Sequence, residues 1–312
     1  MTRILLTGAT GQVGWELEQA LRPIGAVVAP SRGACDLARP DTLARVVDDA
    51  RPDIIVNCAA YTAVDKAEQE TSLAFTVNAD APAELAKAGR RHGALFVHYS
   101  TDYVFDGRKD GAYAEEDAPG PLGAYGRSKL AGEMAVRESG ADYLVFRTSW
   151  VYGARGSNFL RTILRLALER EQLRVVADQT GAPTWSRPVA EITVAALQLD
   201  LARRAAGTFE SAVLHLTAAG STSWHGFASA IVARASALGV ALMCREVVPI
   251  ETRDYPLPAP RPTNSRLSNA ALVKRYGLEM PQWETSLGLC LSEWAALRDS
   301  GARAVDEDEA RR

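Results

Sequence analysis

Cysteine is scarce in this sequence. Among its 312 residues the four cysteines are Cys35, Cys58, Cys244 and Cys290, with no C-x-x-C pair and no histidine at metal-ligand spacing. Isolated thiols argue against a disulfide framework and against a structural zinc site. We therefore expect reduced thiols in a cytoplasmic protein.

Long hydrophobic runs and an excess of either charge are absent as well. No apolar run is long enough to span a bilayer, and residues 1–8 lack the apolar region and cleavage site of a signal peptide. The formal net charge of −3 gives no reason for attraction to nucleic acid or to an anionic membrane. We expect neither as a partner.

Strand-like and helix-like segments alternate through the first half of the chain. Short apolar runs predict strands at 4–7, 26–29, 53–58, 94–99 and 143–147, and helical spacing predicts helices at 11–21, 42–50, 81–90 and 130–138. Apolar strands that alternate with helices are typical of a parallel sheet covered on both faces. The predicted fold class is α/β, a doubly wound parallel sheet of the Rossmann type.

The pattern changes after about residue 150. Amphipathic spacing predicts helices at 158–170 and 188–199, an isolated strand follows at 213–217, and the prolines of 249–262 predict an extended segment.

These segments divide the chain into a larger and a smaller unit. We predict a cofactor-binding Rossmann domain over residues 1–150, with later contributions from about 157–217. A smaller mixed α/β lobe, mainly substrate-binding, is expected over 218–300. Residues 301–312 are polar and small, and are expected to form a flexible tail.

A glycine-rich turn, Gly8-Ala-Thr-Gly11-Gln-Val-Gly14, joins the first expected strand to the first helix. Glycines there permit a tight turn and close approach of the backbone to a pyrophosphate, which the helix N-terminus then faces. A turn without a ligand is the alternative, since turns use glycine anyway. Its place in a βαβ unit favours a dinucleotide site. The G-x-x-G-x-x-G spacing resembles that of the short-chain dehydrogenase/reductase family.

The end of the second strand indicates which dinucleotide binds. An acidic side chain there bonds the ribose hydroxyls of NAD, whereas an arginine accommodates the 2′-phosphate of NADP. This chain has Ser31 and Arg32, with no acid before Asp36. The pair favours NADPH. NADH remains the alternative if Arg32 is a solvated loop residue.

Tyr125 and Lys129 form a Y-x-x-x-K pair, and residues four apart share one face of a helix. Hydride delivery to a ketone creates an alkoxide that a donor must protonate. A free phenol, with a pKa of about 10, is a poor donor at neutral pH. A neighbouring cation lowers that pKa, so Tyr125 is the predicted proton donor and Lys129 its partner.

A hydroxyl precedes this pair in the chain. Thr101 is the second residue after the apolar strand 94–99, where it could bind the substrate carbonyl and relay to Tyr125. A hydroxyl at a strand end can also cap the next turn. The order Thr101, Tyr125, Lys129 favours the catalytic interpretation.

Several longer segments resemble the dTDP-4-dehydrorhamnose reductases, a branch of the short-chain family. They are GATGQVGWEL, NCAAYTAVDKAE, YSTDYVFDG, YGRSKLAGE, RTSWVYG, NFLRTILRLALER, DQTGAPTW and RPTNSRLS. The resemblance covers nearly all of residues 3–295. It implies NADPH-dependent reduction of the C4 ketone of dTDP-4-dehydro-L-rhamnose, the last step of dTDP-L-rhamnose synthesis.

The resemblance also assigns roles by position. It implies that Thr101, Asp102 and Trp150 contact the sugar, and that Lys129 binds the nicotinamide ribose. The cofactor positions that it implies, beside Gly8, Gly14 and Arg32 above, are Gly11, Gln12, Val13, Asp36, Leu37, Ala60, Tyr61 and Thr62. Ala9 stands where relatives often carry lysine, and the loop 31–34 is distinct.

Some members of the branch form homodimers helped by Mg²⁺. The corresponding carboxylates here are Glu16, Glu191 and Glu293. Carboxylate oxygens suit Mg²⁺. All three could equally be solvated helix faces.

Three rival functions share this fold. A sugar-nucleotide dehydratase needs a Thr-Asp-Glu set, but Tyr103 stands in place of the glutamate. An epimerase usually retains NAD through an acidic end of the second strand, which this chain lacks. A non-catalytic regulatory subunit of S-adenosylmethionine synthesis would be expected to lose Thr101, Tyr125 and Lys129, all of which are intact.

Overall fold

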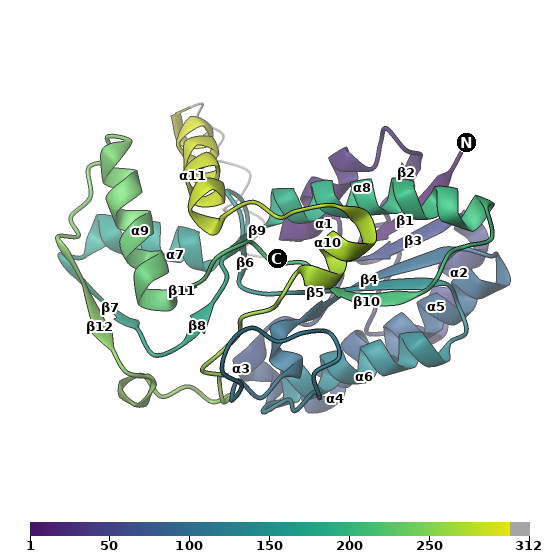
Figure 1. Ribbon diagram of the computed structural model, residues 1–312, viewed down its shortest axis with the longest axis horizontal. Coiled ribbons are helices and arrows are strands. Elements are labelled where there is room, and N and C mark those ends of the chain that lie inside the picture. The colour runs from purple at the N-terminus through teal and green to yellow at the C-terminus, as the bar shows by residue number, and fades with distance from the viewer. Residues whose placement is uncertain (300–312) are drawn as a thin grey trace.

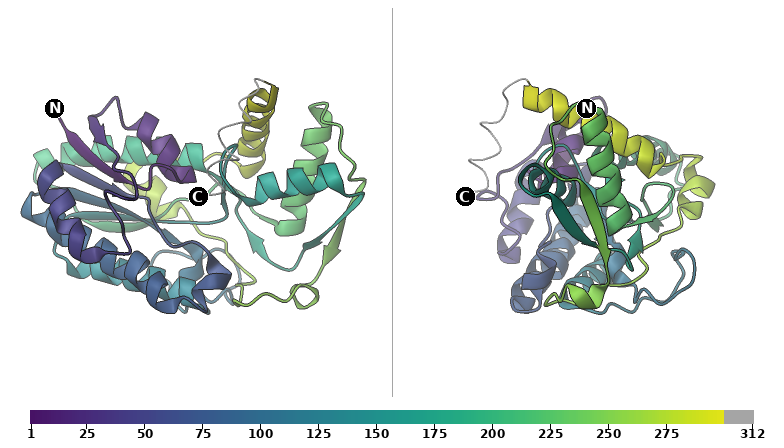
Figure 2. Two further views of the ribbon diagram at one scale, coloured as in Figure 1. Left: turned by 180° about the vertical axis from the view of Figure 1, so that it is seen from behind. Right: turned by 90° about the vertical axis from the view of Figure 1, so that its left-hand side faces the viewer.

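The computed structural model of the protein describes residues 1–299, so the expected tail over 301–312 lies outside the described residues. Two lobes lie side by side, and the chain passes between them several times (Figures 1 and 2). Within the described residues, no helix combines the length and the apolar character that a membrane crossing requires.

The larger lobe is built on one six-stranded sheet in which every pairing is parallel. Its order is β10-β5-β4-β3-β1-β2. The strands are β1 (Arg3–Thr7), β2 (Ala26–Val28), β3 (Ile54–Asn57), β4 (Leu95–Thr101), β5 (Tyr143–Thr148) and β10 (Ala212–His215). The predicted doubly wound α/β fold is confirmed.

Strand β10 corrects one expectation. The sequence predicts an isolated strand at 213–217. The strand found there is instead the edge of the main sheet, where Ala212 pairs with Leu144 of β5. Leu214 and Leu216 are buried in the same core as the strands before them. Burial against this core explains why a segment so far along the chain returns to the first sheet.

Helices cover both faces of the sheet (Figure 1). One face carries α1 (Gln12–Ala20), α8 (Ser186–Ala205) and α10 (Ala270–Tyr276), and the other carries α2 (Pro40–Ala50), α5 (Ala81–Arg91) and α6 (Ala124–Glu138). Short helices α3 (Val64–Ala67), α4 (Thr71–Phe75), the π-helix η1 (Thr76–Asp80) and the 3₁₀ turn η2 (Asp102–Val104) connect them. Helix α6 begins six residues before the predicted residue 130, because the Ala124 amide donates to Glu68 Oε1 over 2.7 Å.

The smaller lobe has its own apolar core, which α7 (Phe159–Glu169), α9 (Trp224–Ala237) and α11 (Trp283–Asp299) share with a strand pair. That pair is β7 (Gln172–Val176) and β12 (Glu246–Ile250), and two further pairs are β6 (Val151–Tyr152) with β9 (Thr184–Trp185) and β8 (Thr180–Gly181) with β11 (Thr222–Ser223). The predicted extended segment at 249–262 begins in β12 and contains one 3₁₀ turn, η3 (Thr252–Asp254).

Contacts at both ends of the interface tie the lobes together. The Asp65 carboxylate of α3 accepts from the Ala259 amide over 3.1 Å and from Arg261 Nη2 over 2.8 Å. At the other end, Arg187 of α8 binds Glu16 of α1 at 3.1 Å and Glu293 of α11 at 2.7 Å.

Candidate active site

The glycine turn has the geometry that a pyrophosphate site needs. Gly8 has a φ of +71°, and a β-carbon there would lie 2.6 Å from the Ala59 amide nitrogen. A β-carbon on Gly14 would lie 2.0 Å from the Gly8 carbonyl oxygen. Gly11 caps α1 without a side-chain hydrogen bond, so the first amides of this helix keep their donors for an anion. These residues fit a dinucleotide.

A side chain beside this turn fits the same ligand. Gln12 Oε1 is buried and has no hydrogen-bond partner within the described part of the chain. A buried acceptor without a partner is costly, and a ligand donor would relieve that cost. Val13, the next residue, is half-buried in the same turn.

The loop after β2 presents its side chains unequally. Ser31 and Arg32 are exposed, as the assignment to a 2′-phosphate requires. Leu37 is buried, and Asp36 Oδ1 accepts from the Ala38 amide over 3.0 Å. The loop thus has a fixed base and an exposed, cationic rim.

The segment after β3 is held by one asparagine. The Tyr61 amide donates to Asn78 Oδ1 over 2.8 Å, and Asn78 Nδ2 donates back to the Tyr61 carbonyl over 3.0 Å. Ala60 is half-buried here and Thr62 is exposed. These residues therefore border the sheet edge at which the glycine turn lies.

Thr101 and Tyr125 meet at the carboxyl end of β4. Burial raises the pKa of Tyr125 to about 12, against a hydrogen bond with Thr101 that lowers it. The sequence had suggested Lys129 as the group that tunes this phenol. In the structure, burial dominates the pKa of Tyr125 and Thr101 supplies the opposing hydrogen bond.

Asp102 sits behind this pair and is 2% exposed. Its Oδ1 accepts from Thr101 Oγ1 over 3.0 Å, whereas its Oδ2 has no partner among the described residues. Burial raises the pKa of Asp102 to about 6, against hydrogen bonds from Ser265 and Thr101. A carboxylate oxygen without a partner is available to a sugar hydroxyl.

Lys129 lies wholly inside the protein. Its Nζ donates to the Tyr99 carbonyl over 2.6 Å and lies 3.2 Å from His98 Nε2. Burial lowers the pKa of Lys129 to about 8, and the charge of Glu133 opposes this shift. Lys129 is therefore largely protonated at neutral pH, and it loses its proton as the pH rises through about 8.

Trp150 has a strained backbone, with a φ of +48° that side-chain-bearing residues seldom adopt. Its indole stacks on that of Trp224 at a centroid distance of 3.5 Å and an interplanar angle of 8°. A β-carbon on Gly181 would lie 2.5 Å from Trp150 Cε2. Stacking on Trp224 and the close approach of Gly181 thus fix the indole.

The three expected metal ligands do not converge. Glu16 and Glu293 both bind the guanidinium of Arg187, and Glu191 is exposed. Over residues 1–299 there is no group of three or more histidine, cysteine or acidic side chains that could hold a metal ion. The guanidinium of Arg187 lies between two of the three carboxylates, those of Glu16 and Glu293.

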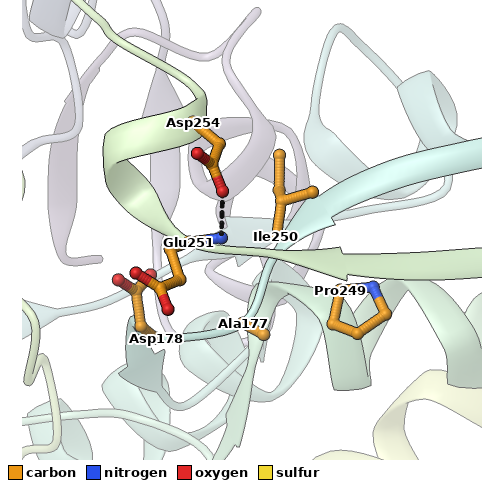
Figure 3. A pocket seen from close by; sticks show the side chains of 6 residues that line it. All are labelled: Ala177, Asp178, Pro249, Ile250, Glu251 and Asp254. Atoms are coloured by element: carbon orange, nitrogen blue, oxygen red, sulfur yellow. Dashed lines mark hydrogen bonds between the residues drawn. The ribbon is translucent and has the colours of Figure 1, made fainter.

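A pocket of about 400 Å³ opens elsewhere, in the smaller lobe between β7 and η3 (Figure 3). Three acidic residues line it. Asp178 accepts from the Thr252 amide and hydroxyl, and Asp254 accepts from the Glu251 amide over 3.4 Å. Two of these carboxylates therefore build the 3₁₀ turn, and the pocket lies apart from the catalytic set.

Sequence reasoning missed His98, Asn57 and Trp224. His98 lies within the buried strand β4, and its Nε2 lies 3.2 Å from Lys129 Nζ. Only the pairing of β3 with β4, which sets Asn57 beside His98, could have shown this. Trp224 opens a helix that the sequence did not predict.

The fold and this site define a class, the dinucleotide-dependent oxidoreductases of the short-chain type. A family model described as "RmlD substrate binding domain" matches residues 1–296. Together with its curated relatives, this places the chain in the dTDP-4-dehydrorhamnose reductase family.

The similarity to these relatives is high and spans almost their whole length. A dTDP-4-dehydrorhamnose reductase of Burkholderia thailandensis is 57% identical over 93% of this chain and 98% of the relative. That of Salmonella typhimurium is 45% identical over 93% of this chain and 97% of the relative. A crystal structure of the Bacillus anthracis enzyme in complex with NADP is 36% identical, covers 94% of this chain and 99% of its own, and superposes with a TM-score of 0.83.

Proposed function

We propose that this protein reduces the C4 ketone of dTDP-4-dehydro-L-rhamnose with NADPH and so completes dTDP-L-rhamnose synthesis. The observation that carries this proposal is the meeting of Thr101 and Tyr125 at the end of β4, one helical turn from the buried Lys129. Family membership supports the substrate, and the NADP bound in the Bacillus anthracis relative supports the cofactor.

The residues of this chain would hold the dinucleotide in an identifiable way. The amides at the start of α1 would face the pyrophosphate, Gln12 Oε1 would gain a donor, and Arg32 would approach the 2′-phosphate. When bound, NADPH supplies a hydride to the C4 carbon.

Tyr125 then protonates the alkoxide oxygen, which Thr101 holds through its hydroxyl. Lys129 provides a positive charge beneath the site and a donor for the ribose. Asp102 accepts from a sugar hydroxyl through Oδ2, and Trp150 packs beside the sugar. Burial of Thr101, Asp102 and Lys129 strengthens the interactions that these residues make.

An assay of NADPH oxidation with dTDP-4-dehydro-L-rhamnose tests the proposal, with the product identified by mass spectrometry and NMR. We expect dTDP-L-rhamnose in a one-to-one ratio with oxidised cofactor. Isomerisation without net oxidation of NADPH, with NAD retained through purification, would indicate an epimerase instead. An inert but correctly folded protein would favour the regulatory alternative.

A magnesium-assisted homodimer stays a prediction. A metal at the expected position requires Glu16 and Glu293 to leave Arg187, because their oxygens now bind its guanidinium. Analytical ultracentrifugation with Mg²⁺ and with EDTA, on the wild type and on Glu191→Gln, tests it. An unchanged mass in all four samples would contradict a metal-assisted dimer and would leave the proposed reductase activity unaffected.

A further inference from the structure

A row of polar side chains crosses three neighbouring strands, at the carboxyl ends of two of them and within the third. Thr7, Asn57 and His98 stand on β1, β3 and β4, and the strand register sets them side by side. Neighbours in register point to the same face of a sheet. That face is the one covered by α6, which brings Lys129 to the end of the row (Figure 1).

The row is a continuous chain of hydrogen bonds. Thr7 Oγ1 donates to Asn57 Oδ1 over 2.5 Å, Asn57 Nδ2 lies 3.1 Å from His98 Nδ1, and His98 Nε2 lies 3.2 Å from Lys129 Nζ. All four side chains are at most 2% exposed. Water is thus kept from these bonds, and each polar atom depends on its neighbour.

The direction of these bonds is tied to the proton on Lys129. With Asn57 Nδ2 donating to His98 Nδ1, the imidazole carries its proton on Nε2 and donates to a neutral amine. With the Asn57 amide turned over, Nδ1–H donates to Oδ1, and Nε2 accepts from an ammonium. Imidazole and carboxamide can each serve in both directions.

The surrounding charges make both states accessible. Burial lowers the pKa of Lys129 to about 8, whereas Glu133 and Cys58 raise it. Glu133 is itself paired with Arg147 at 2.7 Å. Burial and Lys129 hold the pKa of His98 well below its usual range, so the imidazole stays neutral beside the ammonium.

We propose that His98, oriented by Asn57, is a positioning residue for Lys129, and that the hydrogen-bond chain reverses when Lys129 gains or loses its proton. This inference rests on the proposed function for its catalytic meaning. Two of the three N–H groups of the ammonium donate to the Tyr99 carbonyl and to His98 Nε2, so the direction of the third N–H group is fixed. The reversal lets Lys129 change charge without leaving a buried polar atom unpaired.

The first test does not depend on activity. Long-range ¹H–¹⁵N spectra of the full-length protein report the histidine tautomers, and His98→Gln identifies the signal. We expect His98 to remain neutral and to change from the Nδ1–H to the Nε2–H tautomer near pH 8, where Lys129 titrates. Lys129→Met should abolish that change. One tautomer across the whole range, or an imidazolium, would overturn the proposal.

The second test uses pH profiles of kcat and compares two buried histidines. His98→Gln should move the alkaline limb toward lower pH by roughly one unit, since glutamine has no second ring nitrogen for Asn57 to orient and its acceptor is no longer held on the ammonium, and should lower kcat more than it changes KM. His215→Gln, on β10 and equally buried, should lower stability without moving the limb. Equal profiles for the two variants would show that His98 is only structural.

A third variant covers the case in which His98→Gln does not fold. Thr7→Val keeps the shape of the side chain at the far end of the hydrogen-bond chain and removes the donor to Asn57 Oδ1, which accompanies the neutral amine, so a smaller shift of the alkaline limb toward higher pH is expected. The absence of a shift in a folded Thr7→Val variant would contradict the proposed hydrogen-bond chain. If the wild type turns over no substrate, the proposed function fails, while the spectra still decide the hydrogen-bond chain.

Discussion

The two walls of the site are built by different means. The wall on the main sheet is set by strand register: Thr101 ends β4, and α6 places Tyr125 and Lys129 against it. The second wall is set by strain and stacking, with Trp150 in a left-handed conformation against Trp224. Strand register fixes the first wall through the many hydrogen bonds of the sheet, whereas the second wall depends on the contacts of single residues. We propose that the chemistry takes place on the first wall, and recognition of the sugar is expected of the second.

The largest effect is expected from breaking the chemistry of the first wall. Tyr125→Phe removes only the proton donor, so kcat should fall by about 10²–10⁴ while NADPH binding stays nearly intact. Rapid-mixing kinetics and calorimetric titration measure the two quantities. Lys129→Met should damage both, because it removes a cation and a ribose donor. A near wild-type kcat for Tyr125→Phe would refute the assignment.

Stability should separate the two regions next. Arg147 and Glu133 form an ion pair beneath the first wall, with side chains 6% and 3% exposed. Arg147→Met leaves a buried charge unpaired and should cost about 3–5 kcal/mol of unfolding free energy. Arg187, 38% exposed between the lobes, is the matched control. Arg187→Met should cost less than about 2 kcal/mol. Similar losses in urea denaturation would contradict this contrast.

A third experiment sharpens the cofactor end of the first wall. If Arg32 binds the 2′-phosphate, Arg32→Ala should weaken NADPH binding by about 1.5–3 kcal/mol and leave NADH nearly unchanged. Titration of both cofactors measures this difference. Equal losses for the two would show that the exposed rim of the loop does not discriminate.

The smallest effect is expected from disturbing the second wall. Gly181→Ala sets a β-carbon against the Trp150 indole and should raise KM for the sugar nucleotide by an amount equivalent to about 1–3 kcal/mol. Gly288→Ala, where a β-carbon meets nothing within 4 Å, is the control. Near-ultraviolet circular dichroism of the stacked tryptophans reports whether the indole moved. An unchanged spectrum and KM would mean that the position of the Trp150 indole does not depend on its close contact with Gly181.

Sequence alone was most informative where structure is periodic. Apolar strands predicted the parallel sheet, and i, i+4 spacing placed Tyr125 and Lys129 on one helix face. Helix α9 was missed because its small and apolar residues surround the helix and leave no clear amphipathic stripe. Glu16 and Glu293 were expected at a metal site from the resemblance alone, and the sequence could not show their shared partner, Arg187, which is distant from both along the chain. His98 could be recognised only once the register of three strands was known.

The repeated crossing of the chain between the lobes has a consequence for folding. Residues 270–280 return to the core of the main sheet after the chain has built much of the smaller lobe, and α11 then leaves again. Neither lobe can be completed from one continuous stretch, so neither is expected to fold independently during synthesis. The molecule should therefore unfold in a single cooperative transition, with the two walls of its site assembling or disappearing together.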